Sequence, residues 1–74
     1  MRDWLVDYRT KAGLTQAQMA KKLNISEAYY SYIEKGERQK KMDLSLVFQL
    51  SDIFCVTTQQ IVEHEKKWSE SHNV

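Results

Sequence analysis

The sequence predicts an all-α domain built from five helices. Apolar residues recur every three or four positions along most of the 74 residues, and no stretch of strand length alternates between apolar and polar residues. A threonine, serine or aspartate that suits a helix cap precedes four of the periodic segments. We therefore expect residues 1–68 to form a single domain with one core, followed by a polar, fraying tail over residues 69–74.

The first expected helix covers residues 2–12. Gly13 follows it, and glycine readily takes the left-handed conformation at which many helices end. The apolar stripe of this helix consists of Trp4, Leu5, Tyr8 and Ala12. We expect the helix to lie across the next two as a brace.

Two short helices follow, joined by a tight turn. Thr15 and Gln18 form a capping box, so the second helix begins directly after Thr15. Asn24 tolerates the left-handed conformation that ends a helix, and Ser26 caps a third helix that ends at Gly36. So short a connection forces the helices to cross steeply, with apolar side chains and one small residue in the inner angle. These residues are Ala20, Met19, Leu23, Ile25, Tyr30 and Ile33.

A basic loop, GERQKK, leads to the fourth helix and contains no proline or glycine after its first residue. Asp43 caps the fourth helix, and Thr57 with Gln60 forms a second capping box that starts the fifth. The expected buried stripe of the fourth helix comprises Leu44, Val47, Leu50, Ile53 and Phe54. The fifth helix carries the apolar residues Ile61, Val62 and Trp68.

The stretch AGLTQAQMAKKLNISEAYYSYIEKGER resembles the helix-turn-helix of the Cro and repressor family of phage and bacterial regulators, also called the XRE family. Shared features are a leucine before Thr-Gln, a small residue four places after that Gln, an apolar residue and serine at the turn, and an I-E-x-G ending. The resemblance covers roughly residues 2–62 and implies a compact five-helix, lambda-repressor-like DNA-binding domain, with helices 2 and 3 as the motif at about 16–34. Two features depart from the family pattern: Asn24 replaces a glycine, and the loop after the motif is longer and lacks the family's proline.

Carried over position by position, the resemblance implies that the third helix, residues 26–34, lies in the major groove of DNA. The residues implied for contact with base edges are Glu27, Ala28, Tyr29, Ser31 and Tyr32. The residues expected at phosphates are Gln16, Lys35, Arg38, Lys40 and Lys41. The base-facing set contains no arginine or glutamine, so strong bidentate recognition of guanine or adenine by this helix is not expected. The resemblance also implies an ion pair between Arg9 and Glu34.

The net charge of +1 is low for a nucleic-acid binder, but its distribution is uneven. Residues 42–74 are net acidic, whereas positive charge gathers around the second helix of the motif. The basic residues there are Lys21, Lys22, Lys35, Arg38, Lys40 and Lys41. A solvated surface would carry similar lysines, so charge alone does not separate DNA binding from an ordinary exposed face.

The resemblance implies a small transcriptional regulator, with repression favoured, that binds double-stranded DNA as a homodimer on two half-sites, because one module contacts few bases. Since the sequence shows no separate oligomerisation segment, Ile61 and Trp68 are the candidate dimer contacts. An alternative of another class is a protein-interaction module of the same fold, such as an antitoxin-like or anti-repressor partner. Tyr29 and Tyr32 would then form an exposed aromatic patch.

Enzymatic activity is not expected, because His64 and His72 have no convergent nucleophile, metal cluster or glycine-rich phosphate loop near them in the sequence. Cys55 has no second cysteine to pair with, so it is expected to be a core or helix-end residue and not part of a disulfide or zinc site. The sequence shows no leader and no long apolar run. We therefore expect a cytoplasmic protein without a metal, cofactor, membrane contact or small-molecule ligand.

Overall fold

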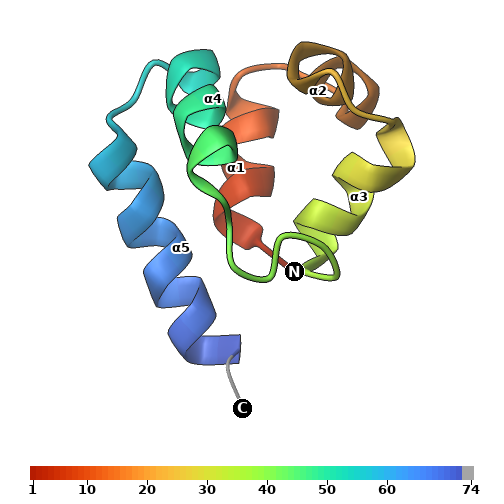
Figure 1. Ribbon diagram of the computed structural model, residues 1–74. Helices are drawn as coiled ribbons and strands as arrows, with labels where there is room; N and C mark the ends of the chain where they lie inside the picture. The colour runs from red at the N-terminus through yellow and green to blue at the C-terminus, as the bar shows by residue number, and fades with distance from the viewer. Residues whose placement is uncertain (73–74) are drawn as a thin grey trace.

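The computed structural model describes residues 1–72 of the chain, with only the backbone described at residue 72. Its helices are α1 (Asp3–Lys11), α2 (Gln16–Leu23), α3 (Glu27–Lys35), α4 (Leu44–Phe54) and α5 (Thr58–His72). Residues 1–72 contain no β-strand, so the predicted all-α class with five helices is confirmed. In Figure 1, α2 and α3 lie on one side of a central pair formed by α1 and α4, and α5 runs down the other side.

The turn between α2 and α3 has the local geometry that the sequence predicts. The Thr15 hydroxyl accepts a hydrogen bond from the Gln18 N–H at 3.1 Å, and the Gln18 side chain accepts one from the Thr15 N–H at 2.8 Å. Asn24 ends α2 with a φ of 58°, and the Ser26 hydroxyl accepts from the Tyr29 N–H at 3.1 Å. The caps satisfy backbone donors at both helix starts, so α3 can follow α2 after only three residues.

The start and end of α4 are also defined by local contacts. The Asp43 carboxylate accepts from the Leu46 N–H at 2.8 Å, and α4 ends at Cys55, which has a φ of 55°. Of the two roles expected for Cys55, the structure gives it that of an exposed helix-end residue. Thr57 and Gln60 then form the expected capping box of α5, with bonds of 3.0 and 3.1 Å.

The core lies where α1, α2, α3 and α4 meet, and α5 closes it through one fully buried isoleucine, Ile61. The buried apolar residues are Leu5, Met19, Ala20, Leu23, Tyr30, Ile33, Leu46, Val47, Leu50 and Ile61. Ala20 is 3% exposed, in keeping with its predicted place where α2 and α3 approach. All six residues predicted to fill the angle between α2 and α3 belong to this core or pack against it.

Two predictions about buried faces are wrong. Ala12 is exposed, because it caps the end of α1 and lies beyond its buried stripe. Leu44 is 70% exposed, because it precedes the buried Leu46 by two positions and so lies about 200° around the helix from it. The outer face of α4 thus carries Leu44 and Phe48, and the latter is 60% exposed.

The tail also differs from expectation over its first part. Residues 69–72 are helical, because α5 continues through His72. That the end of this helix frays stays a prediction. Residues 73–74 of the expected tail lie outside the described residues. Every helix within residues 1–72 is too short or too polar to cross a lipid bilayer.

The two glycines provide a matched test of how tightly α5 is held against the end of α3. Both have positive φ, 71° at Gly13 and 83° at Gly36, but a Cβ on Gly13 would meet nothing within 4 Å, whereas one on Gly36 would lie 2.7 Å from the Trp68 ring. We expect Gly13→Ala to lower the free energy of unfolding by about 1–2 kcal/mol through backbone strain alone. Gly36→Ala should cost at least ~1 kcal/mol more, because the ring must also move. Urea denaturation of both variants measures the difference, and equal losses would show that Trp68 yields without cost.

Candidate nucleic-acid interface

The two faces of α3 differ sharply in exposure. Tyr30, Ile33 and Glu34 are buried against the core. The exposed face, which we call the outer face of α3, comprises Glu27, Ala28, Tyr32 and Lys35, with Ser31 half-buried beside them. The structure therefore brings together on one free surface most of the residues that the sequence predicted to face DNA bases.

Tyr29 is the exception within the predicted base-facing set. Its side chain is half-buried and packs against the core. Its hydroxyl accepts a hydrogen bond from the Gln39 side-chain amide at 3.0 Å. Tyr29 therefore links α3 to the loop that follows.

Tyr32 lies at the end of the outer face, next to two cations. Its ring centroid is 5.5 Å from the Lys35 ammonium and 6.0 Å from the Arg38 guanidinium carbon. Its carbonyl accepts from the N–H groups of Glu37 and Arg38 at 2.9 and 3.2 Å, so the loop folds back over the end of α3. Arg38 is thereby placed beside the tyrosine that was expected to contact bases.

A buried carboxylate, that of Glu34, holds α3 to α1 and α2. Glu34 is 1% exposed and accepts from Arg9 Nε at 2.6 Å, from the Tyr30 hydroxyl at 2.7 Å and from the Gln16 amide at 2.8 Å. Arg9 also donates to the Leu14 carbonyl at 3.0 Å. The Arg9–Glu34 pair that the family resemblance implies is thus present, within a larger network.

The network changes the acidity of two of its members. The hydrogen bond to Glu34 raises the pKa of the Arg9 guanidinium above its ordinary value. Burial, and then the hydrogen bond to Glu34, raises the pKa of the Tyr30 hydroxyl well above its ordinary value. Both shifts favour the protonated form, in which each side chain donates to Glu34.

Gln16, which was expected at a phosphate, has a second role. Its half-buried side-chain amide donates to Glu34 at 2.8 Å and therefore helps to position α3. The backbone N–H groups of the first turn of α2 remain directed out of the helix end, as at any helix N-terminus.

The loop between α3 and α4 is organised by Gln39, which sequence reasoning did not single out. Gln39 has a φ of 54°, a conformation that few non-glycine residues adopt. Its side chain donates to the Tyr29 hydroxyl and accepts from the Asp43 N–H at 3.1 Å. This residue therefore defines the turn in a loop that lacks the proline of the family pattern.

Sequence reasoning also missed Arg2, whose side chain is fully buried. Its guanidinium donates to Glu65 at 2.8 and 2.9 Å and to the carbonyls of Ile33, Arg38 and Gln39. No local pattern marks it, because its anionic partner lies 63 residues away in the sequence. This buried arginine therefore helps to hold the basic loop in place against the end of α3.

Of the two residues expected at a dimer contact, Ile61 lies in the core, whereas Trp68 stays a prediction and also has partners within the domain. Ile61 is fully buried and has no surface to offer a partner, so its prediction as a dimer contact is wrong. Trp68 is half-buried: its Nε1 donates to the Met1 carbonyl at 2.9 Å, and Arg2 lies 4.5 Å over its ring. Trp68 therefore joins α5 to the N-terminal segment.

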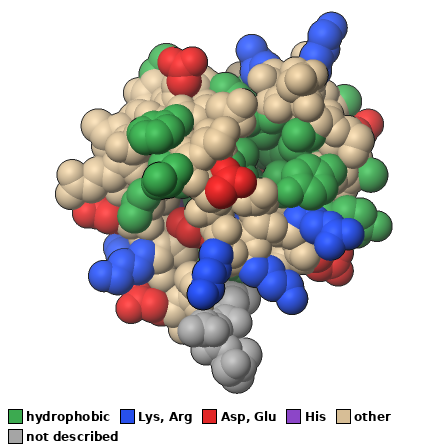
Figure 2. Space-filling model, in the orientation of Figure 1, with side chains coloured by type: hydrophobic (Ala, Val, Ile, Leu, Met, Phe, Trp, Pro, Cys, Tyr) green, Lys and Arg blue, Asp and Glu red, His purple; other side chains and the backbone are tan. Residues whose placement is uncertain are grey.

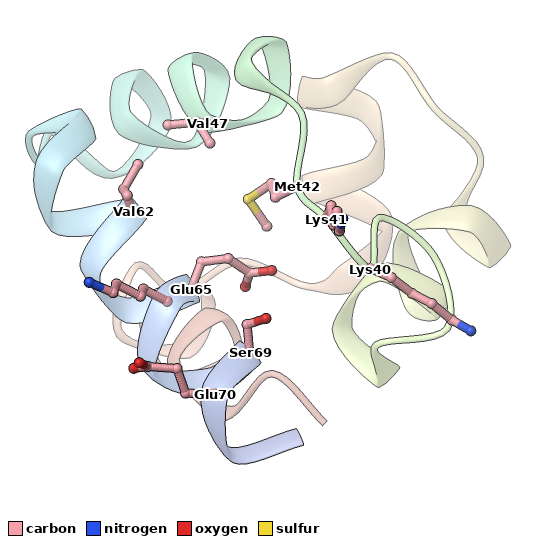
Figure 3. A pocket seen from close by; sticks show the side chains of 9 residues that line it. Lys40, Lys41, Met42, Val47, Val62, Glu65, Ser69 and Glu70 are labelled. Atoms are coloured by element: carbon pink, nitrogen blue, oxygen red, sulfur yellow. The ribbon is translucent and has the colours of Figure 1, made fainter. Parts of the chain in front are cut away.

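Basic side chains lie at the end of α3 and along the loop that follows it, and two of the loop lysines border a groove. In Figure 2, Lys and Arg side chains gather over the lower end of α3 and the loop that follows. Lys35, Arg38, Lys40 and Lys41 are all exposed. The groove, shown in Figure 3, has a volume of about 340 Å³ and lies between this loop, α4 and α5. Lys40, Lys41, Met42 and Glu65 line it, and the Lys40 ammonium points away from it.

Within residues 1–72, no three histidine, cysteine, aspartate or glutamate side chains converge into a metal-binding group. The surface instead presents the exposed face of a helix, flanked by cations. That arrangement suits binding to a nucleic acid, whose base edges and phosphates both offer contacts, better than it suits catalysis.

Comparison with known proteins points to one family. A family model described as helix-turn-helix matches residues 5–61, which include all of α2, α3 and α4 and all of α1 except its first two residues. An uncharacterized HTH-type transcriptional regulator, YqaF of Bacillus subtilis (strain 168), is 42% identical to this chain over 45 residues. The aligned part is 61% of this chain and 59% of that relative, so the chain spans less than two thirds of the relative's length. No solved structure gives a significant match.

The Glu34 network predicts a strong energetic coupling between α1 and α3. Arg9→Ala should lower the free energy of unfolding by about 3 kcal/mol, because it leaves a buried carboxylate without its cation. Glu34→Ala should cost a similar amount, and a double-mutant cycle should show that the two losses are far from additive. Lys11→Ala, which removes the same charge from an exposed position on the same helix, is the control and should have little effect. Additive losses would mean that the pair carries no coupling energy.

The raised pKa of Tyr30 predicts that the protein loses stability at alkaline pH. Its folded pKa lies above its unfolded value of about 10, so above that pH the unfolded chain releases a proton that the folded chain keeps. Stability is therefore full below about pH 10 and should fall by up to about 1.4 kcal/mol per pH unit above it from this group. Tyr30→Phe should be less stable at neutral pH, because it loses the bond to Glu34, but its stability should fall less steeply with rising pH. Urea denaturation between about pH 8 and 11 compares the slopes, and identical slopes would contradict this assignment.

Proposed function

Because this chain belongs to the XRE-type helix-turn-helix family, we propose that it binds double-stranded DNA sequence-specifically and acts as a small transcriptional regulator. The observation that carries the proposal is the outer face of α3, which is largely exposed, whereas the opposite face is buried against the core and bonded through Glu34. A helix presented in this way, directly after a capped partner helix, fits the major groove. Members of this family bind DNA and are not enzymes.

We assign base contacts to the outer face of α3. Glu27 would accept from a cytosine amino group, and Ala28 would offer its methyl group to thymine. Tyr32 would donate to a base acceptor or pack on a thymine methyl, with Ser31 beside it. Tyr29 takes a marginal place, because its hydroxyl is engaged by Gln39.

Phosphate contacts fall to the cations and to one helix start. Lys35, Arg38, Lys40 and Lys41 would supply the salt-dependent part of the affinity that is the same for every sequence. For Gln16, the backbone N–H at the positive end of α2 is the proposed contact, since its amide is bonded to Glu34. With a net charge of only +1, affinity must come from where these cations lie and not from overall charge.

We further propose that the unit acting on DNA is the single domain of residues 1–68, extended by the rest of α5. It would act as a repressor and as a homodimer on two half-sites, because one α3 reads few bases. Ile61 cannot contribute to that dimer, whereas Leu44 and Phe48 on the outer face of α4 are exposed apolar residues available to it. The alternative of a protein-interaction module is weakened, because Tyr29 packs against the core and leaves Tyr32 as the single exposed tyrosine of that patch.

The direct test is selection of bound sequences from random duplexes, followed by gel-shift titration at several salt concentrations. The proposal requires a duplex that binds at physiological salt with a clear preference over random DNA, and an affinity that falls as salt rises. Binding without sequence preference would remove the specific role of α3. Absence of any shift would favour the protein-interaction alternative.

Tyr32 provides the sharpest test of sequence reading. Tyr32→Ala should weaken binding to the selected duplex by roughly 1–3 kcal/mol and binding to random DNA much less, because a base contact contributes specificity. Lys40→Ala is the matched comparison and should weaken both duplexes equally while lowering the salt slope by about one unit. Since Tyr32 is 42% exposed, the thermal stability of the Tyr32→Ala variant should barely differ from that of the unaltered protein. Equal losses on both duplexes for Tyr32→Ala would make it a backbone contact.

A further inference from the structure

Arg2 connects α5 to the basic loop. Its Nη1 donates to the Ile33 carbonyl at 2.5 Å and the Arg38 carbonyl at 3.0 Å, and its Nη2 donates to the Gln39 carbonyl. Its Nε and Nη2 meet both carboxylate oxygens of Glu65 on α5 at 2.9 and 2.8 Å. One guanidinium thus holds the end of α3, two consecutive loop residues and α5.

Because Arg2 is charged and buried, it needs both an anionic partner and acceptors for its N–H groups. The side chain is 0% exposed, and a buried cation is tolerated only when it is paired and its donors are satisfied. Glu65, 13% exposed at its side chain, is the carboxylate that pairs with it. The Arg2 guanidinium carbon also lies over the Trp68 ring, 4.5 Å from its centroid. Loss of the negative charge of Glu65 would therefore weaken the hold on Arg2, and with it the position of the backbone carbonyls that Arg2 binds.

The carbonyls that Arg2 binds belong to the backbone that carries the loop cations. Arg38 supplies one of them, and Lys40 follows immediately after Gln39, which supplies another. Gln39 has a φ of 54°, a conformation that a non-glycine residue keeps only when its surroundings impose it. The bond from Arg2 to the Gln39 carbonyl is one of the contacts that impose it.

We propose that Arg2 and Glu65 are positioning residues for DNA binding. Together they form a latch, anchored on α5, that fixes the loop of residues 36–43 so that its cations face phosphates while α3 lies in the groove. Neither residue touches DNA in this proposal. The inference rests on the proposed DNA-binding function and adds that α5, which lies outside the helix-turn-helix formed by α2 and α3, supports that binding through Glu65.

The test compares two variants with identical change in charge. Glu65→Gln weakens the latch, whereas Glu63→Gln removes the same charge from an exposed position on the same helix. Removal of a negative charge should by itself strengthen DNA binding slightly, so the latch predicts an effect of opposite sign at Glu65. For Glu65→Gln we expect the Kd for selected and random duplexes to rise roughly fivefold to twentyfold, with the salt slope reduced by about one to two units, because each phosphate contact contributes about 0.9 to that slope. Glu63→Gln should bind as the unaltered protein does or slightly more tightly.

Hydrogen exchange separates positioning from a loss of global stability. In folded Glu65→Gln, the amides of the loop should exchange faster, while those of Leu23 and Ile33 in the core should change together with the measured free energy of unfolding. Equal Kd values and salt slopes for the Glu65 and Glu63 variants would overturn the latch. If Glu65→Gln does not fold, Glu65→Asp decides, because it keeps the charge and withdraws the carboxylate by one methylene: unchanged binding would again overturn the proposal. Absence of DNA binding by the unaltered protein would instead overturn the proposed function and this inference with it.

Discussion

A carboxylate removed from water must be surrounded by donors, and in this domain that requirement fixes the arrangement of three helices. Glu34 projects from α3 and is satisfied by Arg9 from α1, Gln16 from α2 and Tyr30 from its own helix. Each donor would be lost if its helix rotated or slid, and the buried charge would then lack a partner. The backbone of the same residue takes part too, because its carbonyl accepts from the Arg2 N–H at 2.6 Å.

The exposed surface follows from this buried one. Since Glu34 and its neighbours Tyr30 and Ile33 point inward, the residues between them along α3 must point outward, and they do so at a fixed angle to α2. Arg9 and Arg2 both act at the C-terminal end of α3. Arg9 holds the Glu34 side chain against α1, and Arg2 holds the end of the helix and the loop against α5. The recognition that we propose for α3 would therefore depend on contacts made behind it, by residues that face the interior.

Sequence reasoning succeeded where the physical signal is local. Thr15 with Gln18, Ser26, and Thr57 with Gln60 act on backbone groups within three residues of themselves, so the helix starts could be predicted. Leu44 was misplaced because apolar residues on both faces of α4 fit more than one helical stripe. Arg2 and Trp68 could not be placed, since their partners, Glu65 and Met1, are far away in the sequence. The turn at Gln39 was equally hidden, because a positive φ in a non-glycine residue depends on contacts made by the folded chain.

Cys55 ends α4 with its thiol exposed, at the start of the connection to α5. In Figure 1 this connection lies on the opposite side of the molecule from α3. It is the single cysteine of the chain. A fluorophore or spin label attached there would occupy one defined position, away from the outer face of α3 and from the basic loop. The domain thus carries a natural attachment point for a probe of rotational diffusion. Rotational diffusion slows as a complex grows, so the size of any complex formed at α3 can be followed without altering the outer face of α3.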